Sequence, residues 1–168
     1  MALGTTRVAV EFSGSHIKSL DLGDATFPIA LTQALSLLNG TGAGQADMVF
    51  TDQRTLAASA TENLDLAGSL TDAYGATMTF ARIKALIITA AVANTNDVQL
   101  TRPASNGVPL FLAAGDGLPI RPGGLFAWAC SDATGIVVTA ATGDLLTITN
   151  SAGTTGVTYN VIVVGASA

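Results

Sequence analysis

Turn-forming residues interrupt this chain about every 8–12 residues from Asp47 onward, and short runs rich in apolar and β-branched residues lie between them. In one run, Leu146 and Ile148 alternate with Thr147 and Thr149. A period of two places one kind of side chain on each face of a strand. Strands and helices do not alternate along the chain, which disfavours a parallel nucleotide-binding sheet. The pattern predicts a mainly β protein, an antiparallel β-sandwich of jelly-roll-like form.

Ten segments are predicted as strands of this sandwich domain, which is expected to span residues 47–168. They are residues 48–56, 62–66, 77–90, 97–102, 108–113, 118–121, 124–131, 136–142, 145–149 and 157–164. Arg82 and Lys84 make a helix conceivable in segment 77–90, but its many β-branched residues favour a strand. Segment 124–131 has no polar face, which predicts burial on both sides.

Residues 1–46 are predicted to form an N-terminal arm outside the sandwich. Residues 7–12 alternate like a short strand, and residues 21–24 are typical of a turn. Segment 29–40 has a mostly helical spacing of apolar residues, with a proline before it and a glycine at its end, so it is predicted as the one short helix. The glycines of 41–46 predict a flexible link; they follow a helix and therefore do not fit a dinucleotide-binding turn.

The balance of charge excludes several classes of partner. Charged residues make up 11% of the chain, and the net charge is −5. The seven cations are scattered singly, so the chain is not expected to bind nucleic acid. The longest charge-free stretch, 145–168, is broken by Asn, Gly and Thr, so no membrane span is expected. The N-terminus lacks the basic and apolar pattern of a secretory signal, which predicts a soluble, non-exported protein.

So few charges cover a folded surface thinly, as in the interfaces between permanently associated subunits, which are depleted in charge. We therefore expect a homo-oligomer, a trimer in preference to a dimer. Apolar segments are the candidate contacts between its subunits. The interface candidates are Val8, Val10, Phe12, Leu110, Phe111, Leu112, Phe126 and Trp128.

Residue types that carry catalysis or bind metals are few. His16 is the single histidine and Cys130 the single cysteine, which excludes an intrachain disulfide and a multi-cysteine zinc site. Two pairs of carboxylates lie close in sequence, and both are typical of turns and strand ends: Asp21 with Asp24, and Glu62 with Asp65. The sequence predicts no catalytic residue, no cofactor and no metal site.

Several segments, in a similar order over about residues 40–165, resemble a family of small virion proteins of tailed bacteriophages. They are GAGQAD at 42–47, TENLDLAGSLTDAYG at 61–75, FARIKA at 80–85, RPGG at 121–124, and DATG at 132–135 followed by TGDLL at 142–146. The resemblance implies a head decoration (cement) protein, or another structural component of the virion, without enzymatic activity. Such a protein binds the major capsid protein at the capsid surface of the virion, after assembly in the host cytoplasm.

Two other functions stay open at this point. One is a tail or fibre-associated module that binds host glycans by stacking sugars on an exposed shelf of aromatic residues. Its candidate residues are Trp128, Phe126, Phe111 and Tyr74. The other is a hydrolase that uses His16 or a pair of carboxylates.

Overall fold

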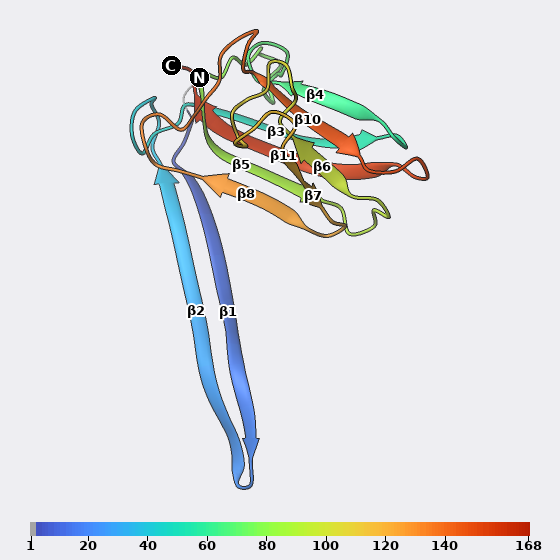
Figure 1. The fold of residues 1–168 in the computed structure, drawn as a ribbon. Helices are drawn as coiled ribbons and strands as arrows, with labels where there is room; N and C mark the ends of the chain where they lie inside the picture. The colour runs from blue at the N-terminus through green and yellow to red at the C-terminus, as the bar shows by residue number, and fades with distance from the viewer. Residues whose placement is uncertain (1–2) are drawn as a thin grey trace.

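The computed structural model describes residues 3–168, which form eleven β-strands and, within that range, no helix (Figure 1). The predicted mainly β, antiparallel class is confirmed. Strands β1 (Thr6–Leu20) and β2 (Gly23–Leu37) form a long hairpin, the arm, that projects from the remaining strands, the body. The body strands are β3 (Met48–Leu56), β4 (Thr61–Asp65), β5 (Arg82–Ala90), β6 (Val98–Thr101), β7 (Gly117–Ile120), β8 (Leu125–Ala129), β9 (Ile136–Val137), β10 (Leu145–Asn150) and β11 (Val157–Ala166).

The body strands are divided between two antiparallel sheets. One has the order β4-β10-β6-β7, and the other has the order β3-β11-β5-β8, with β9 paired to β5. The pairing is nested along the chain: β3 pairs with β11, β4 with β10, β5 with β8, and β6 with β7. Segments far apart in sequence therefore become neighbours in both sheets.

Both sheets contribute to one hydrophobic core. Leu86 and Val161 come from the β3-β11-β5-β8 sheet, and Leu100 and Ile148 come from the other. Along β10 each buried residue is followed by a partly exposed one, which is the alternation read from the sequence. The same period orients side chains in β6 and in most of β11.

The predicted helix over 29–40 is wrong, because this segment belongs to strand β2 and the turn after it. Its apolar residues Ile29, Leu31, Leu35 and Leu37 all occupy odd positions, and residues at even spacing share one face of a strand. Leu38 alone departs from this pattern. β2 pairs over its whole length with β1, which extends eight residues beyond the predicted strand 7–12. The long-range pairing therefore decides the conformation that the local spacing left ambiguous.

The segment 41–46 is an ordered turn and not a flexible link. The Gly42 N–H donates to Gln45 Oε1 at 2.9 Å, and the Leu38 N–H donates to the Gly44 carbonyl at 2.9 Å. The Gln45 side chain also lies over Gly40, where a Cβ would approach Gln45 Oε1 to 2.6 Å. The turn holds the root of the arm against the body.

Two strand predictions in the body also need correction. Segment 108–113 is irregular because Pro109 has no N–H for a ladder, and because the Arg102 guanidinium binds the Phe111 carbonyl at 2.8 Å. Segment 124–131 contains β8, but it is not buried on both sides. β8 pairs with β5 alone and so lies at a sheet edge, where Leu125, at the start of the strand, is 68% exposed.

Some boundaries also differ from the prediction. β5 begins at Arg82, five residues later than expected, and β9 covers two residues of the predicted strand 136–142. Residues 3–168 contain no helix with the length and apolar character of a membrane span.

Candidate interaction surface

The root of the arm packs against the outer face of the β3-β11-β5-β8 sheet. Leu37 is fully buried there with Ala46, Ala85 and Val164, while Val8 and Leu35 are partly buried at the margin. Ala85 and Val164 lie on the face opposite to Leu86 of β5 and Val163 of β11, which belong to the main core, as alternation between adjacent residues requires. The arm is thus anchored by a second, smaller apolar cluster.

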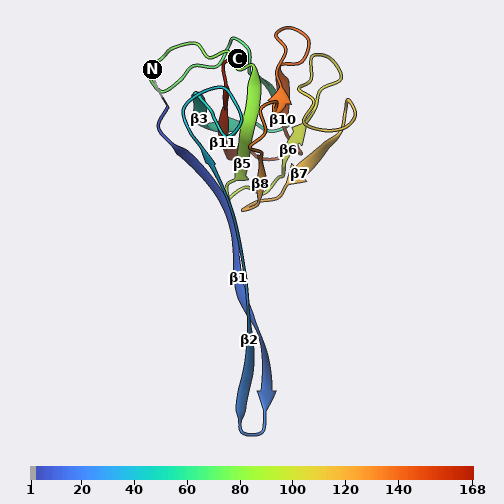
Figure 2. The same cartoon turned by 90° about the vertical axis from the view of Figure 1, so that its left-hand side faces the viewer.

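Beyond its root, the arm leaves the body (Figure 2). The pairing of its strands gives it two chemically different faces. The register pairs Val8 with Leu35, Val10 with Gln33, and Phe12 with Leu31, which places all six side chains on one face. Phe27 and Ile29 continue this apolar face toward the turn. The opposite face carries mostly small or polar residues, with Ile17 as an apolar exception opposite Thr26: Arg7, Ala9, Glu11, Ser13 and Ser15 on β1, and Thr26, Pro28, Ala30, Thr32, Ala34 and Ser36 on β2.

The apolar face is open along the projecting part of the arm. Val10 is 58% exposed, Phe12 56%, Phe27 68%, Ile29 43% and Leu31 64%. Near the root the same face borders a cleft of about 240 Å³, whose other wall is Ala127 to Ser131 at the end of β8. A mainly apolar surface, interrupted by Gln33, therefore runs from the edge of the body along the arm.

The structure brings three of the interface candidates together on the arm and separates them from most of the others. Val8, Val10 and Phe12 share the apolar face, and Trp128 is among the residues that line the far wall of the cleft. Leu112 is fully exposed in the irregular segment. The four candidates Leu110, Phe111, Phe126 and Trp128 are half-buried and pack against the core.

The four aromatic residues considered for sugar stacking do not form an exposed shelf. Phe111 and Phe126 lie against each other with ring centroids 6.4 Å apart and an interplanar angle of 45°. Trp128 packs on the core beside them, whereas Tyr74 is exposed in the 70–78 loop region. The first three rings therefore serve packing, which removes the geometric basis of the sugar-stacking interpretation for them.

Most of the cationic side chains make polar contacts within the chain. Arg82 donates to the carbonyls of Thr41 and Ala168, and Arg102 to those of Phe111 and Leu112. Arg121 lies near Asp97, with 3.7 Å between Nε and Oδ2. Within residues 3–168 the cations do not gather into a basic patch of the kind that holds nucleic-acid phosphates.

Lys84 is fully buried, a role that its place in an alternating segment did not indicate. Its ammonium donates to the carbonyl of Asp132 and, at 2.8 Å, to that of Ala133. These carbonyls belong to the loop that follows β8, and the neighbouring Ser131 carbonyl accepts a hydrogen bond from Gly44 in the turn at the root of the arm. Lys84 thus holds the loop after β8 in place, and this loop in turn binds the turn at the root of the arm.

Cys130 lies beside this loop in an environment that favours the neutral thiol. Burial and the Asp132 carboxylate raise the pKa of the Cys130 thiol. The Gly135 N–H lowers the pKa of Asp132, because it stabilises the carboxylate. His16, in contrast, is exposed on the arm opposite Phe27, four rungs from the turn-closing pair. The thiol and the imidazole therefore belong to different parts of the molecule, and the thiol lacks the activation that a nucleophile requires.

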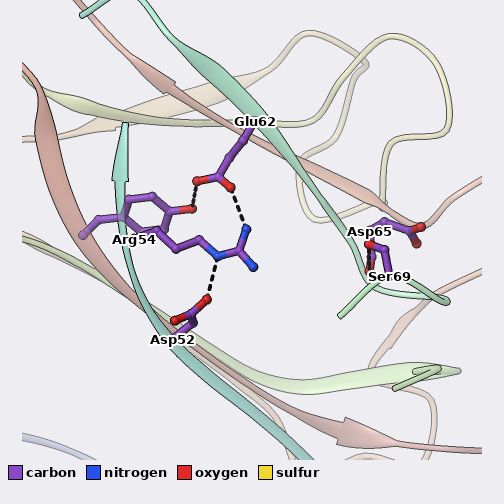
Figure 3. Close-up of polar contacts among 6 residues, drawn as sticks. Asp52, Arg54, Glu62, Asp65 and Ser69 are labelled. Atoms are coloured by element: carbon purple, nitrogen blue, oxygen red, sulfur yellow. Dashed lines mark hydrogen bonds and ion pairs between the residues drawn. The ribbon is translucent and has the colours of Figure 1, made fainter. Parts of the chain in front are cut away.

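A polar cluster joins the two sheets where β3 passes into β4 (Figure 3). Glu62 accepts hydrogen bonds from the Tyr159 hydroxyl and from Arg54 Nη1, both at 2.6 Å. Arg54 Nε also donates to Asp52 at 3.0 Å. The side chains of Asp52, Arg54, Glu62 and Tyr159 each have a partner in the cluster, so the arrangement is suited to linking the two sheets. The sequence did not reveal it, because Glu62 and Tyr159 are 97 positions apart.

Raising the pH above about 10 is expected to destabilise the body through this cluster. Burial, reinforced by Glu62, raises the pKa of Tyr159 in the folded state, whereas an unfolded tyrosine titrates near its ordinary value. The unfolded state therefore loses its proton first. The contribution of Tyr159 to the free energy of unfolding should be constant below the ordinary pKa of tyrosine and should then fall by at most about 1.4 kcal/mol per pH unit.

Urea unfolding between pH 8 and pH 11 measures this slope. Tyr159→Phe should remove it in part, whereas Tyr74→Phe, which changes an exposed tyrosine, should unfold like the wild type. Equal slopes for wild type and Tyr159→Phe would show that Tyr159 does not cause the pH dependence.

The other residues considered for chemistry are placed apart. Asp21 and Asp24 lie at the tip of the arm, where Asp24 accepts a hydrogen bond from Ser19, and Asp65 binds the Ala67 N–H. Among residues 3–168, no group of three or more His, Cys, Asp or Glu side chains is arranged to hold a metal ion. Comparison of the chain with protein-family models, curated proteins and solved structures finds no match.

Proposed function

We propose that the chain is a non-enzymatic structural protein of a tailed-bacteriophage virion, a decoration protein that binds the major capsid protein on the head. The observation that carries the proposal is the arm: a long hairpin that exposes an apolar face and serves no site within its own chain. An exposed apolar surface of this kind marks an interaction site. The sequence resemblance to small virion proteins supplies the biological setting.

As part of the proposal, we assign the body to the jelly-roll β-sandwiches, and its strand orders support this assignment. The strand orders of its two sheets are β3-β11-β5-β8 and β4-β10-β6-β7. Both orders follow from the nested pairing, in which strands from opposite ends of the body lie side by side. Such pairing is expected when a long antiparallel ribbon rolls into two facing sheets, and jelly rolls built in this manner occur in viral capsid domains. A closed, well-packed body of this type suits a component that has to withstand pressure without performing chemistry.

Homo-oligomer formation is part of the proposal, with a trimer preferred and a dimer as the alternative. Charged residues are 11% of the chain, and the body uses several of them in internal bonds. Contacts among copies and with the capsid would therefore be mainly apolar. Interfaces of about 1,600 Å² repeated over many copies stabilise a shell without any catalytic group.

Binding of the purified chain to capsids that lack it tests the proposal. We expect saturable binding in many copies per capsid, with little weakening between low and high salt, because apolar contacts are not screened. Co-sedimentation at two salt concentrations measures both quantities. No binding to the capsids would contradict the function, and release by salt would contradict the apolar contacts.

A further inference from the structure

The apolar face of the arm forms a stripe on a twisted ribbon that stands away from the body (Figure 2). Its exposed centre is formed by Val10 and Phe12 on β1 and by Phe27, Ile29 and Leu31 on β2. A two-stranded hairpin is marginally stable in water unless another layer covers its apolar face. The strands are fifteen residues each, so an uncovered arm would combine a long unsupported ribbon with a large exposed apolar stripe.

Charge on the arm narrows the choice of partner. Arg7 and Lys18 are balanced against Glu11, Asp21 and Asp24, so residues 6–37 carry a net charge of 2 − 3 = −1 with neutral histidine. A polyanion or an anionic lipid surface needs an excess of cations, which the arm does not offer. The stripe carries no charge from Val8 to Phe12 on β1 or along β2 from Phe27 to Leu37. An uncharged apolar ribbon of the same length is its natural complement.

The area of the stripe matches what such a pairing needs. The five exposed side chains of its centre offer roughly 500 Å² per arm, given the size of aromatic and aliphatic side chains. Two facing stripes would bury about 1,000 Å² in total, the lower limit for a specific interface. Two arms are expected to pack through their apolar faces and not to pair edge to edge. Pro28 in β2 favours this geometry, because proline lacks the N–H that would bond to an added strand.

We propose that the occupant of the stripe is the same stripe of a second copy of this chain. The arms of neighbouring copies pack face to face as two sheet layers, with Phe12, Leu31 and Ile29 in the contact and the Ser- and Thr-bearing faces outward. The inference rests on the proposed function and selects its dimer alternative, because two identical stripes that face each other join two copies and leave no stripe for a third. Association of the arms does not require a capsid, so it can be tested separately from capsid binding.

Sedimentation velocity of the full chain at about 1–50 µM, without capsids, tests the inference. The wild type should be oligomeric, and Leu31→Glu should dissociate it or weaken association at least tenfold. Ala30→Glu is the matched control, because it adds the same charge at the adjacent position on the polar face and should associate like the wild type. Thermal unfolding of both variants verifies that the body is intact, and a second stripe variant, Phe12→Gln, repeats the test without a charge.

Three results would overturn the inference. One is a monomeric wild type over this range, and another is equal weakening by Leu31→Glu and Ala30→Glu. The third is a monomeric chain whose capsid binding is abolished by Leu31→Glu, which would assign the stripe to the capsid and leave the proposed function standing. A wild type that is oligomeric but does not bind capsids would instead contradict the proposed function and leave the arm contact standing.

Discussion

Replacing Lys84 with alanine is expected to lower the free energy of unfolding by about 3 kcal/mol. The substitution removes a fully buried side chain and leaves the carbonyls of Asp132 and Ala133 without their donor. Both consequences destabilise, the first through a cavity and the second through the loss of a charged donor to two partly buried carbonyl groups. For a domain of this size the melting temperature should fall by roughly 6–12 °C.

Two further variants separate the causes. Lys84→Met keeps an apolar stem of similar length and loses only the ammonium, so its loss of stability should be smaller than that of Lys84→Ala. Lys18→Ala, an exposed lysine on the arm, should leave the melting temperature unchanged. If Lys84→Ala unfolds like Lys18→Ala, the buried ammonium is not a structural element of the body.

Shortening the arm is expected to abolish self-association and to reduce capsid binding at least tenfold, while the body stays as stable as before. Residues 11–32 would be replaced by Asn-Gly, so that Val10 and Gln33 close the hairpin. This pair lies an even number of rungs from the natural closing pair Leu20 and Gly23, and the geometry of a two-residue turn is therefore kept. The buried root at Leu37 is untouched.

The physical reason is loss of both contact area and multivalency. The variant lacks Phe12, Phe27, Ile29 and Leu31, and a monomer binds the capsid through one body instead of several linked bodies. Sedimentation velocity, thermal unfolding and capsid co-sedimentation measure the three properties separately. Full capsid occupancy by the shortened chain would contradict a role for the arm in attachment.

Local pattern was sufficient for most of the body. Strand β3 spans the predicted residues 48–56, and β10 and β11 differ from their predictions by one or two residues at one end. In these segments period-two alternation, β-branched residues and flanking turns all favour the same structure. The apolar run 108–113 predicts a strand, but Pro109 cannot donate a hydrogen bond to a ladder and the segment is irregular.

The arm was misread because two periodicities share the same residues. Ile29, Leu31, Leu35 and Leu37 fit a helical spacing loosely and a strand spacing fully, and pairing with β1 decides between them. The candidates Val8, Val10 and Phe12 were identified correctly as apolar positions of a strand, but the length of that strand was underestimated. Stripe residues of β2 were therefore absent from the candidate list.

Long-range contacts explain what the sequence did not reveal about the polar groups. Lys84 was counted among scattered cations, yet its partners lie 48 and 49 positions away. The bonds of Glu62 to Arg54 and Tyr159 likewise depend on the packing of two sheets. No local pattern predicts such pairs, because the register of distant strands creates them.

Cryo-electron microscopy of virions from the phage proposed to encode this chain tests the central claim most directly. The account predicts hundreds of copies on the head at positions of local symmetry, with jelly-roll bodies on the capsid protein and arms of neighbouring copies packed together. A few copies at the tail tip or fibres, or none on the particle, would contradict it. The tail position would favour the alternative of a module that contacts host glycans.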